Sequence, residues 1–186
     1  MASITVVDAN GALSFTAAAG GETVNGSSMS GALTVFGGSD SERIIGGSGA
    51  DTLLGGSGSE TLTGGAGNNL FVIGAGAENA GAHYVITDFT SSDALFVGGD
   101  IAFAAASIAA APGNSFTLSN GATVTFANVL VSSIASSIRL VGPGPVSSAS
   151  VPVAISPGGD TLFGGASDTL IGGASSAETV DRKSVV

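Results

Sequence analysis

Four contiguous nine-residue units constrain the fold of this chain more than any other feature. Aligned on Gly-Gly, they read GGSDSERII (37–45), GGSGADTLL (46–54), GGSGSETLT (55–63) and GGAGNNLFV (64–72), without an insertion. A fixed short period of this kind is the signature of a solenoid. Flexible Gly/Ser linkers do not place large apolar residues at one phase, as these units do with Ile44, Leu53, Leu62 and Phe71. The repeats therefore predict an ordered, stacked structure.

Each unit predicts a turn followed by a short strand. The glycines permit positive φ and close backbone approach, and the large apolar residue near the end of the unit points inward. Two units make one coil, and successive coils stack their strands in parallel around a ladder that no single repeat could bury. The predicted fold class is all-β: a parallel β-roll, or β-solenoid, of glycine-rich nonapeptide repeats with flanking antiparallel hairpins.

Turn signals on both sides of the repeats predict further strands. Residues 4–15 surround Asn10-Gly11, and residues 116–126 surround Asn120-Gly121, both typical of tight hairpins. A second N-terminal turn is expected at Asn25-Gly26. Segments 83–89 and 93–97 alternate apolar and polar residues, as half-buried strands do. Residues 101–111 fit either a helix or a buried strand, and the sequence leaves this open.

These patterns divide the chain into five segments. The predicted segments are an N-terminal β capping or assembly segment (1–36), the β-roll (37–100), a β-rich capping segment with hairpin 116–126 (101–140), a Pro/Gly/Ser connector (141–157) and a degenerate repeat tail with a candidate secretion signal (158–186). The tail contains GGDTLFGGASDTLIGG at 158–173, with units one residue short of nine. It is either the remainder of a longer array or a set of strands that docks elsewhere, for instance onto the open end of a neighbouring molecule's solenoid.

The net charge and the absence of cysteine argue against several classes of binding partner and metal site. Fourteen acidic residues against four basic ones give a formal net charge of −10, which argues against nucleic acid and anionic membranes and favours cations. The acidity is also compatible with a role in solubility alone. With no cysteine in the chain, neither a disulfide nor a thiolate zinc site can form. Bound calcium would supply the missing cross-link.

The four units resemble the RTX (repeats-in-toxin, haemolysin-type calcium-binding nonapeptide repeat) family. Residues 46–54 match the G-G-x-G-x-D-x-U-x pattern at every position, and residues 83–97 are similar to the segment that commonly follows the last repeat. The resemblance implies a parallel β-roll with calcium between turns, and secretion by a Gram-negative bacterium through an uncleaved C-terminal signal. Consistently, Met1–Val7 does not look like a cleaved signal peptide, and we expect no membrane insertion.

Candidate metal ligands follow from the coil geometry. Calcium prefers six or more oxygen ligands from carboxylates and carbonyls. Because one coil takes two units, the sixth-position side chains pair as Glu42 with Glu60 on one edge and Asp51 with Asn69 on the other. Glutamate is one methylene longer than the aspartate preferred in the family, so we expect Asp51 with Asn69 to be the better pair. The remaining candidates are the turn residues Asp40, Gly47, Gly49, Gly65 and Gly67.

Two alternatives accompany this site. The turns could hold no ion, with the glycines alone carrying the fold. Asp88 and Asp93 could contribute to a distal ion, but we expect them to cap strands.

No catalytic motif is present. The chain has no H-E-x-x-H, no G-x-S-x-G and a single histidine, His83, read as an exposed strand residue. We therefore expect a non-catalytic extracellular structural protein that binds calcium and self-assembles, as a homopolymer, into a surface layer, fibre or matrix. The alternative is a calcium-dependent folding and type I secretion module of a larger toxin or adhesin.

Overall fold

The structure is a computed structural model that describes residues 3–6, 12–17, 20–74, 79–141, 161–163 and 179–181. The chain forms two compact units, residues 1–142 and 143–186. Each unit is described by itself.

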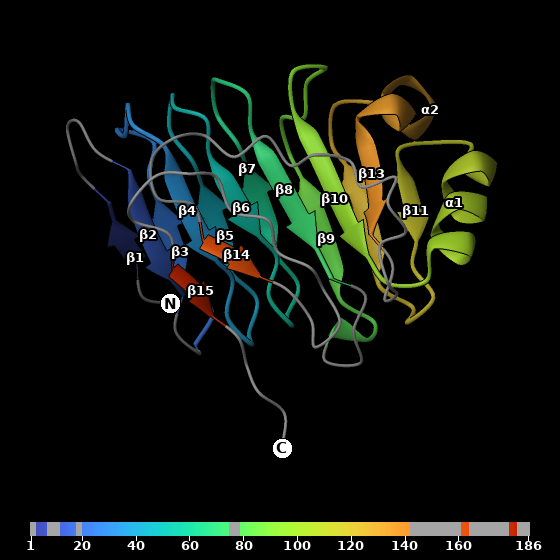
Figure 1. Ribbon diagram of the computed structural model, residues 1–186, viewed down its shortest axis with the longest axis horizontal. Coiled ribbons are helices and arrows are strands. Elements are labelled where there is room, and N and C mark those ends of the chain that lie inside the picture. Colours follow the sequence, from blue (N-terminus) through green and yellow to red (C-terminus); the bar gives the residue numbers. More distant parts are fainter. Residues whose placement is uncertain are drawn as a thin grey trace. The chain divides into compact units, whose positions relative to one another are not determined.

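The first unit consists of two stacks of short strands, between which the chain alternates (Figure 1). The seven-stranded sheet has the order β1 (Ser3–Thr5), β3 (Thr23–Asn25), β5 (Arg43–Ile45), β7 (Thr61–Thr63), β9 (His83–Ile86), β12 (Thr123–Phe126) and β11 (Ser115–Thr117). The six-stranded sheet has the order β13 (Ile138–Val141), β10 (Ala94–Gly98), β8 (Leu70–Ile73), β6 (Thr52–Leu54), β4 (Leu33–Phe36) and β2 (Leu13–Thr16).

The predicted β-roll is confirmed. In the repeats, Arg43 pairs with Thr61 and Thr52 with Leu70, so each strand lies beside the strand two units later in parallel register. The apolar residues of the four units, Ile44, Leu53, Leu62 and Phe71, are all 0% exposed. Burial of each such side chain contributes roughly 1.5–3 kcal/mol relative to exposure, which a stack of coils achieves and a single unit cannot.

Glycine is required where the turns of successive coils touch. A Cβ on Gly56 would collide with the carbonyl oxygen of Gly38, and one on Gly58 with that of Asp40. At these positions the requirement comes from close backbone approach, because neither glycine has a positive φ. The repeated glycines therefore set the spacing between coils.

Aromatic residues extend the core beyond the repeats. The ring of Phe89 lies 5.8 Å from that of Phe71 and 5.2 Å from that of Phe126. All three rings are 0% exposed. These rings join the last repeat to the segment that follows it. The two strands expected at 83–89 and 93–97 are confirmed by β9 and β10.

Helices stand at one end of the solenoid. Residues 101–111, for which the sequence allowed a helix or a strand, form a helix, α1 (Ile101–Ala110). Asp100 is its N-cap, and the Asp100 side chain accepts a hydrogen bond from the Phe103 amide. α1 packs against β11 and β13, and a short helix, α2 (Val131–Ile134), leads through a 3-10 turn (Ala135–Ser137) into β13. No helix in the described part of the chain is long and apolar enough to cross a lipid bilayer.

One hairpin was predicted correctly and the other was not. β11 and β12 form the antiparallel hairpin expected within 116–126. The hairpin expected within 4–15 is wrong: β1 pairs in parallel with β3, and β2 pairs in parallel with β4, in different sheets. Each strand there lies beside the next coil, because stacking buries its apolar side chains against the ladder. The turn residues Asn10-Gly11 lie outside the described residues.

The second unit contains one parallel pair, β14 (Thr161–Phe163) and β15 (Thr179–Asp181). Thr161 pairs with Thr179, eighteen residues later, the same offset that separates Arg43 from Thr61. The tail therefore repeats the coil length of the roll. The predicted connector from residue 142 onward and the rest of the 158–173 repeats lie outside the described residues.

Candidate metal centre

Parallel stacking brings the sixth-position side chains together in the predicted pairs. The turns at 37–42 and 55–60 lie on one edge of the roll, where the register Arg43–Thr61 places Glu42 beside Glu60. We call this the glutamate edge. The turns at 46–51 and 64–69 lie on the opposite edge, where the register Thr52–Leu70 places Asp51 beside Asn69. We call this the aspartate edge.

On the aspartate edge, Asp51 is 1% exposed and is engaged by backbone amides. Its Oδ1 accepts a hydrogen bond of 2.8 Å from Leu33, one coil earlier, and its Oδ2 accepts one of 2.6 Å from Gly47 in its own turn. Burial raises the pKa of Asp51, and the amides of Gly47 and Leu33 partly offset this. Both carboxylate oxygens of Asp51 therefore accept hydrogen bonds from backbone amides.

The same link continues along this edge. Asn69 Oδ1 accepts a hydrogen bond of 3.0 Å from the Asp51 amide, and its Nδ2 donates to the Gly65 carbonyl at 3.4 Å. The Asn69 amide in turn donates to Asp93 Oδ1 at 2.8 Å. Side chains of successive coils thus form a continuous ladder of capped amides.

Asp88 and Asp93 cap backbone amides at strand ends, as expected. The two oxygens of Asp88 accept hydrogen bonds from the amides of Gly64 and Gly65, at 2.8 and 2.7 Å. The second oxygen of Asp93 accepts from the Thr90 amide at 2.7 Å. Each carboxylate satisfies amides that a turn would otherwise leave unpaired.

The predicted turn glycines of this edge make close contacts between coils. A Cβ on Gly49 would collide with the Gly31 carbonyl oxygen, and one on Gly67 with that of Gly49. Gly65 and Gly67 also have positive φ, 85° and 92°. The Gly47 carbonyl accepts a hydrogen bond of 3.0 Å from Ala66. The structure therefore places all four glycines where turns stack.

The glutamate edge is built differently. Glu42 and Glu60 are 3% and 1% exposed. Glu42 Oε2 accepts one hydrogen bond of 3.2 Å from the Gly38 amide. The other three carboxylate oxygens, Glu42 Oε1 and both of Glu60, are buried without a hydrogen-bond partner. An unpaired buried carboxylate is costly unless it is neutralised or coordinates a cation.

The pKa values of Glu42 and Glu60 are both raised in this buried pair. Burial, followed by the negative charge of Glu42, raises the pKa of Glu60 to about 8, and the nearby amides of Gly58 and Gly56 offset this only in part. The pKa of Glu42 is also raised, mainly by burial and further by the charge of the exposed Asp40. The two carboxyl groups therefore favour a proton or another positive charge between them.

Tyr84 closes this edge. It stands in register with Glu60 in the next coil and is 0% exposed. Its hydroxyl donates a hydrogen bond of 2.7 Å to the Gly56 carbonyl. In the other direction, Glu22 occupies the matching position one coil before Glu42. The glutamate stack thus runs through three coils and ends at an aromatic ring.

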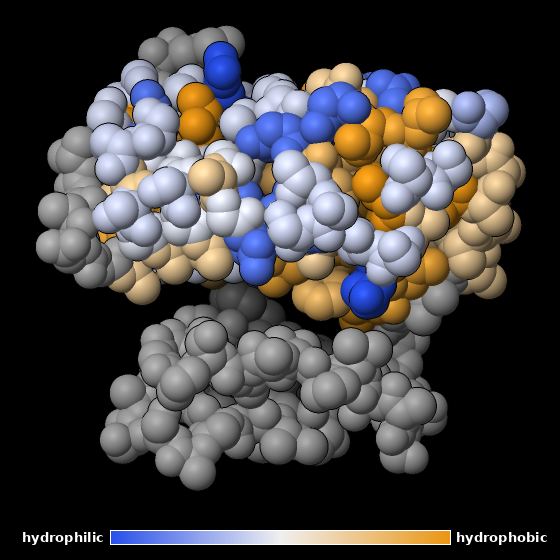
Figure 2. All heavy atoms as spheres, turned by 90° about the horizontal axis from the view of Figure 1, so that it is seen from above, coloured by the Kyte–Doolittle hydropathy of each residue, from blue (hydrophilic) through white to orange (hydrophobic). Residues whose placement is uncertain are grey.

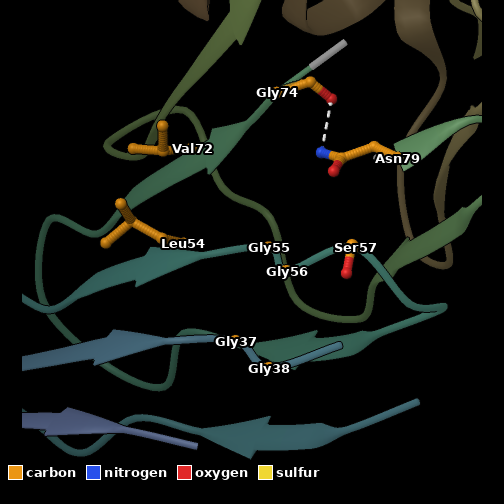
Figure 3. A pocket seen from close by; sticks show the side chains of 9 residues that line it. All are labelled: Gly37, Gly38, Leu54, Gly55, Gly56, Ser57, Val72, Gly74 and Asn79. Atoms are coloured by element: carbon orange, nitrogen blue, oxygen red, sulfur yellow. Dashed lines mark hydrogen bonds between the residues drawn. The ribbon is translucent and has the colours of Figure 1, made fainter. Parts of the chain in front are cut away.

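A hollow of about 450 Å³ opens beside the same turns. Its lining glycines come from three successive coils, at Gly37-Gly38, Gly55-Gly56 and Gly74, and the side chain of Asn79 closes one side by donating to the Gly74 carbonyl at 3.0 Å (Figure 3). Neither Glu42 nor Glu60 lines this hollow. It is therefore distinct from the buried carboxylate pair.

The described residues contain no group of three or more His, Cys, Asp or Glu side chains that could hold a metal ion. A cation on either edge would therefore need backbone carbonyl oxygens besides the paired side chains, which suits calcium. His83, the single histidine, is exposed, and its Nδ1 lies 2.7 Å from Thr123 Oγ1.

Comparison with known proteins agrees with the repeat geometry. Residues 36–71 match the family model of the RTX calcium-binding nonapeptide repeat in four copies. No curated protein and no solved structure matches the chain. The matched residues carry both edges, from Glu42 to Asn69.

Proposed function

We propose that this chain, whose four RTX repeats imply calcium binding, is a secreted, non-catalytic structural protein that self-assembles with copies of itself into a surface layer, fibre or matrix. The match of residues 36–71 to calcium-binding nonapeptide repeats supports the calcium-binding β-roll in this proposal.

The observation that carries the proposal is the surface of α1. The helix reads IAFAAASIAA, with no charged residue, and among its described side chains only Ala104 is buried. A helix that is apolar all round normally lies inside a protein. Phe103 is 45% exposed on it. We infer that a second copy of the chain covers this helix.

Other apolar side chains reinforce this inference. Leu130, just before α2, is 54% exposed, and Val141, at the end of β13, is 50% exposed. In Figure 2 the hydrophobic colours gather on the half of the described surface that carries α1. Exposed apolar patches of this kind mark protein interaction sites.

The opposite end of the solenoid offers a complementary feature. In the part of the chain that is described, β1 and β2 each pair with a single strand and stand at the edges of their sheets. Their sequences, SIT and LSFT, contain no charge. Proteins commonly blunt such edges with charged residues or proline, so these strands favour pairing with another chain.

The tail supports assembly as well. The β14–β15 pair repeats the eighteen-residue coil offset, so the tail has the strand spacing that continues a roll. We propose that these strands extend the open end of a neighbouring molecule.

The alternative is a calcium-dependent folding and type I secretion module. The unpaired carboxylate oxygens of Glu42 and Glu60 favour it, because a chain that buries them without a cation would be poorly stable. The two functions differ in one observable: the module stays monomeric when calcium is added, and the structural protein polymerises.

Electron microscopy of the full chain, with calcium and then with chelator, tests the proposal. We expect regular fibres or sheets from the wild type, and their loss in Phe103→Asp, which places a charge on the exposed helix. Ser119→Asp adds the same charge at another exposed position and should assemble normally. Monodisperse particles from the wild type in both conditions would reject assembly and favour the secretion module.

A further inference from the structure

We infer that calcium binds this chain on the glutamate edge, between Glu42 and Glu60, and that the aspartate edge is held together by hydrogen bonds without a metal. The inference rests on the calcium binding that the four repeats imply. It reverses the preference for Asp51 with Asn69 that the sequence pattern gave.

The side-chain oxygens of the aspartate edge do not require a cation as a partner. Both oxygens of Asp51 and the side-chain oxygen of Asn69 already accept backbone hydrogen bonds of 2.6–3.0 Å. Asp93 continues the pattern, with both of its oxygens accepting from amides. Hydrogen bonds from amides stabilise a buried carboxylate in its charged form. The side-chain oxygens of this edge therefore already have hydrogen-bond donors within the chain.

The glutamate edge lacks such partners. Three of its four carboxylate oxygens are buried with no hydrogen-bond partner, although Glu42 and Glu60 lie in adjacent coils and are at most 3% exposed. Charging both groups of this buried pair without a cation is costly, because the like charges repel each other and have lost their water. A divalent cation between them removes both penalties.

Backbone carbonyl oxygens lie at the same place, and that of Gly38 also accepts a hydrogen bond of 2.9 Å from the Ser57 amide. Gly56 and Gly58 bring their turn into contact with the carbonyl oxygens of Gly38 and Asp40 in the preceding coil. These carbonyls belong to the same two turns as Glu42 and Glu60. Carboxylate and carbonyl oxygens together are the donor set that calcium prefers. Glutamate here supplies the charge for a site of stacked turns.

Metal titrations of the full chain test the inference through two readouts. Calcium affinity is measured by calorimetry, and Tb³⁺ luminescence is excited through Tyr84, which is the only tyrosine in a chain without tryptophan. Glu42→Gln with Glu60→Gln should weaken calcium binding by at least about tenfold, because two charged ligands are lost. The tyrosine-excited Tb³⁺ signal should be lost with it.

Variants of the aspartate edge provide the matched controls. Asp51→Asn removes a charge there, and Asn69→Asp adds one. Both should keep the calcium affinity within about threefold, since substitutions at separate sites act independently.

Each outcome decides between the edges. If Asn69→Asp tightens calcium binding while the double glutamine variant binds like the wild type, the ion lies on the aspartate edge and the inference is wrong. A wild-type chain that binds neither metal would instead reject the proposed function.

Discussion

The backbone amide of Asp51 donates a hydrogen bond of 3.0 Å to Oδ1 of Asn69, which occupies the same position one coil later. The amide of Leu33 makes the same bond to Asp51, and the amide of Asn69 makes it to Asp93. All three acceptors are at least 96% buried. A side chain in each coil thus completes the backbone of the coil before it and fixes the stacking register.

Removal of one acceptor from this ladder should destabilise the roll. Asn69→Leu leaves the buried Asp51 amide unpaired, and we expect a loss of about 1–3 kcal/mol in unfolding free energy. Asn69→Asp keeps an acceptor at the same place and should lose less. Urea denaturation of the two variants measures the difference, and equal losses would show that the side-chain oxygen has no such role.

Alanine should be poorly tolerated where turns touch. In Gly58→Ala the new methyl group collides with the Asp40 carbonyl oxygen, so we expect a loss of about 1–3 kcal/mol from overpacking. A Cβ atom added at Gly113 would meet no neighbouring atom, and Gly113 has no positive φ. Gly113→Ala should therefore be neutral or slightly stabilising. Similar melting temperatures for both variants would argue against the close coil spacing.

The aromatic cluster should be a major part of the core. Phe89 is 0% exposed and lies between the rings of Phe71 and Phe126. Phe89→Ala should reduce the unfolding free energy by about 3–5 kcal/mol. Phe103, which is 45% exposed, serves as the control, and Phe103→Ala should leave monomer stability nearly unchanged. Chemical denaturation below the assembly concentration compares them.

Stability in chelator should depend on pH through Glu60. Its pKa is raised from 4.5 to about 8 in the folded chain, so between these values the folded state holds a proton that the unfolded state releases. The stabilisation from this group is complete below pH 4.5 and is lost as the pH rises toward 8. The difference in unfolding free energy between the wild type and Glu60→Gln, followed across this range, should change with pH. A constant difference would contradict the raised pKa.

The repeats made much of the fold predictable. Ile44, Leu53, Leu62 and Phe71 were expected inside because they share one phase, and all are 0% exposed. The hairpin around Asn120-Gly121 was also predicted, from its turn residues, and the antiparallel pairing of β11 with β12 confirms it. Such features depend on neighbours along the chain or on a strict period, and both are visible in a sequence.

The N-terminal strands were misread for a physical reason. Asn10-Gly11 resembles a hairpin turn, but stacking on the next coil overrode this local preference. A weaker signal was present: GALS at 11–14 recurs as GALT at 31–34, twenty residues later. This matches the pairing of Leu13 with Leu33. The first coils are two residues longer than the nonapeptide coils, so a search for a nine-residue period missed them.

The sequence predicted which side chains of the candidate site lie beside each other. It did not predict which of their oxygens accept hydrogen bonds. The coil model placed Glu42 beside Glu60 and Asp51 beside Asn69, as the register has them. The sequence could not reveal that backbone amides saturate Asp51 while the oxygens of Glu60 have no partner. That difference depends on how each turn orients its amides, which only the stacked coils define.

The most direct test of the account is thermal unfolding of the full chain as a function of calcium concentration. A cation that binds only the folded roll raises the melting temperature continuously as its concentration exceeds the dissociation constant. We predict this rise for the wild type, with little or none in the variant that carries Glu42→Gln and Glu60→Gln. A wild-type melting temperature that is the same in calcium and in chelator would contradict the central claim that the roll binds calcium.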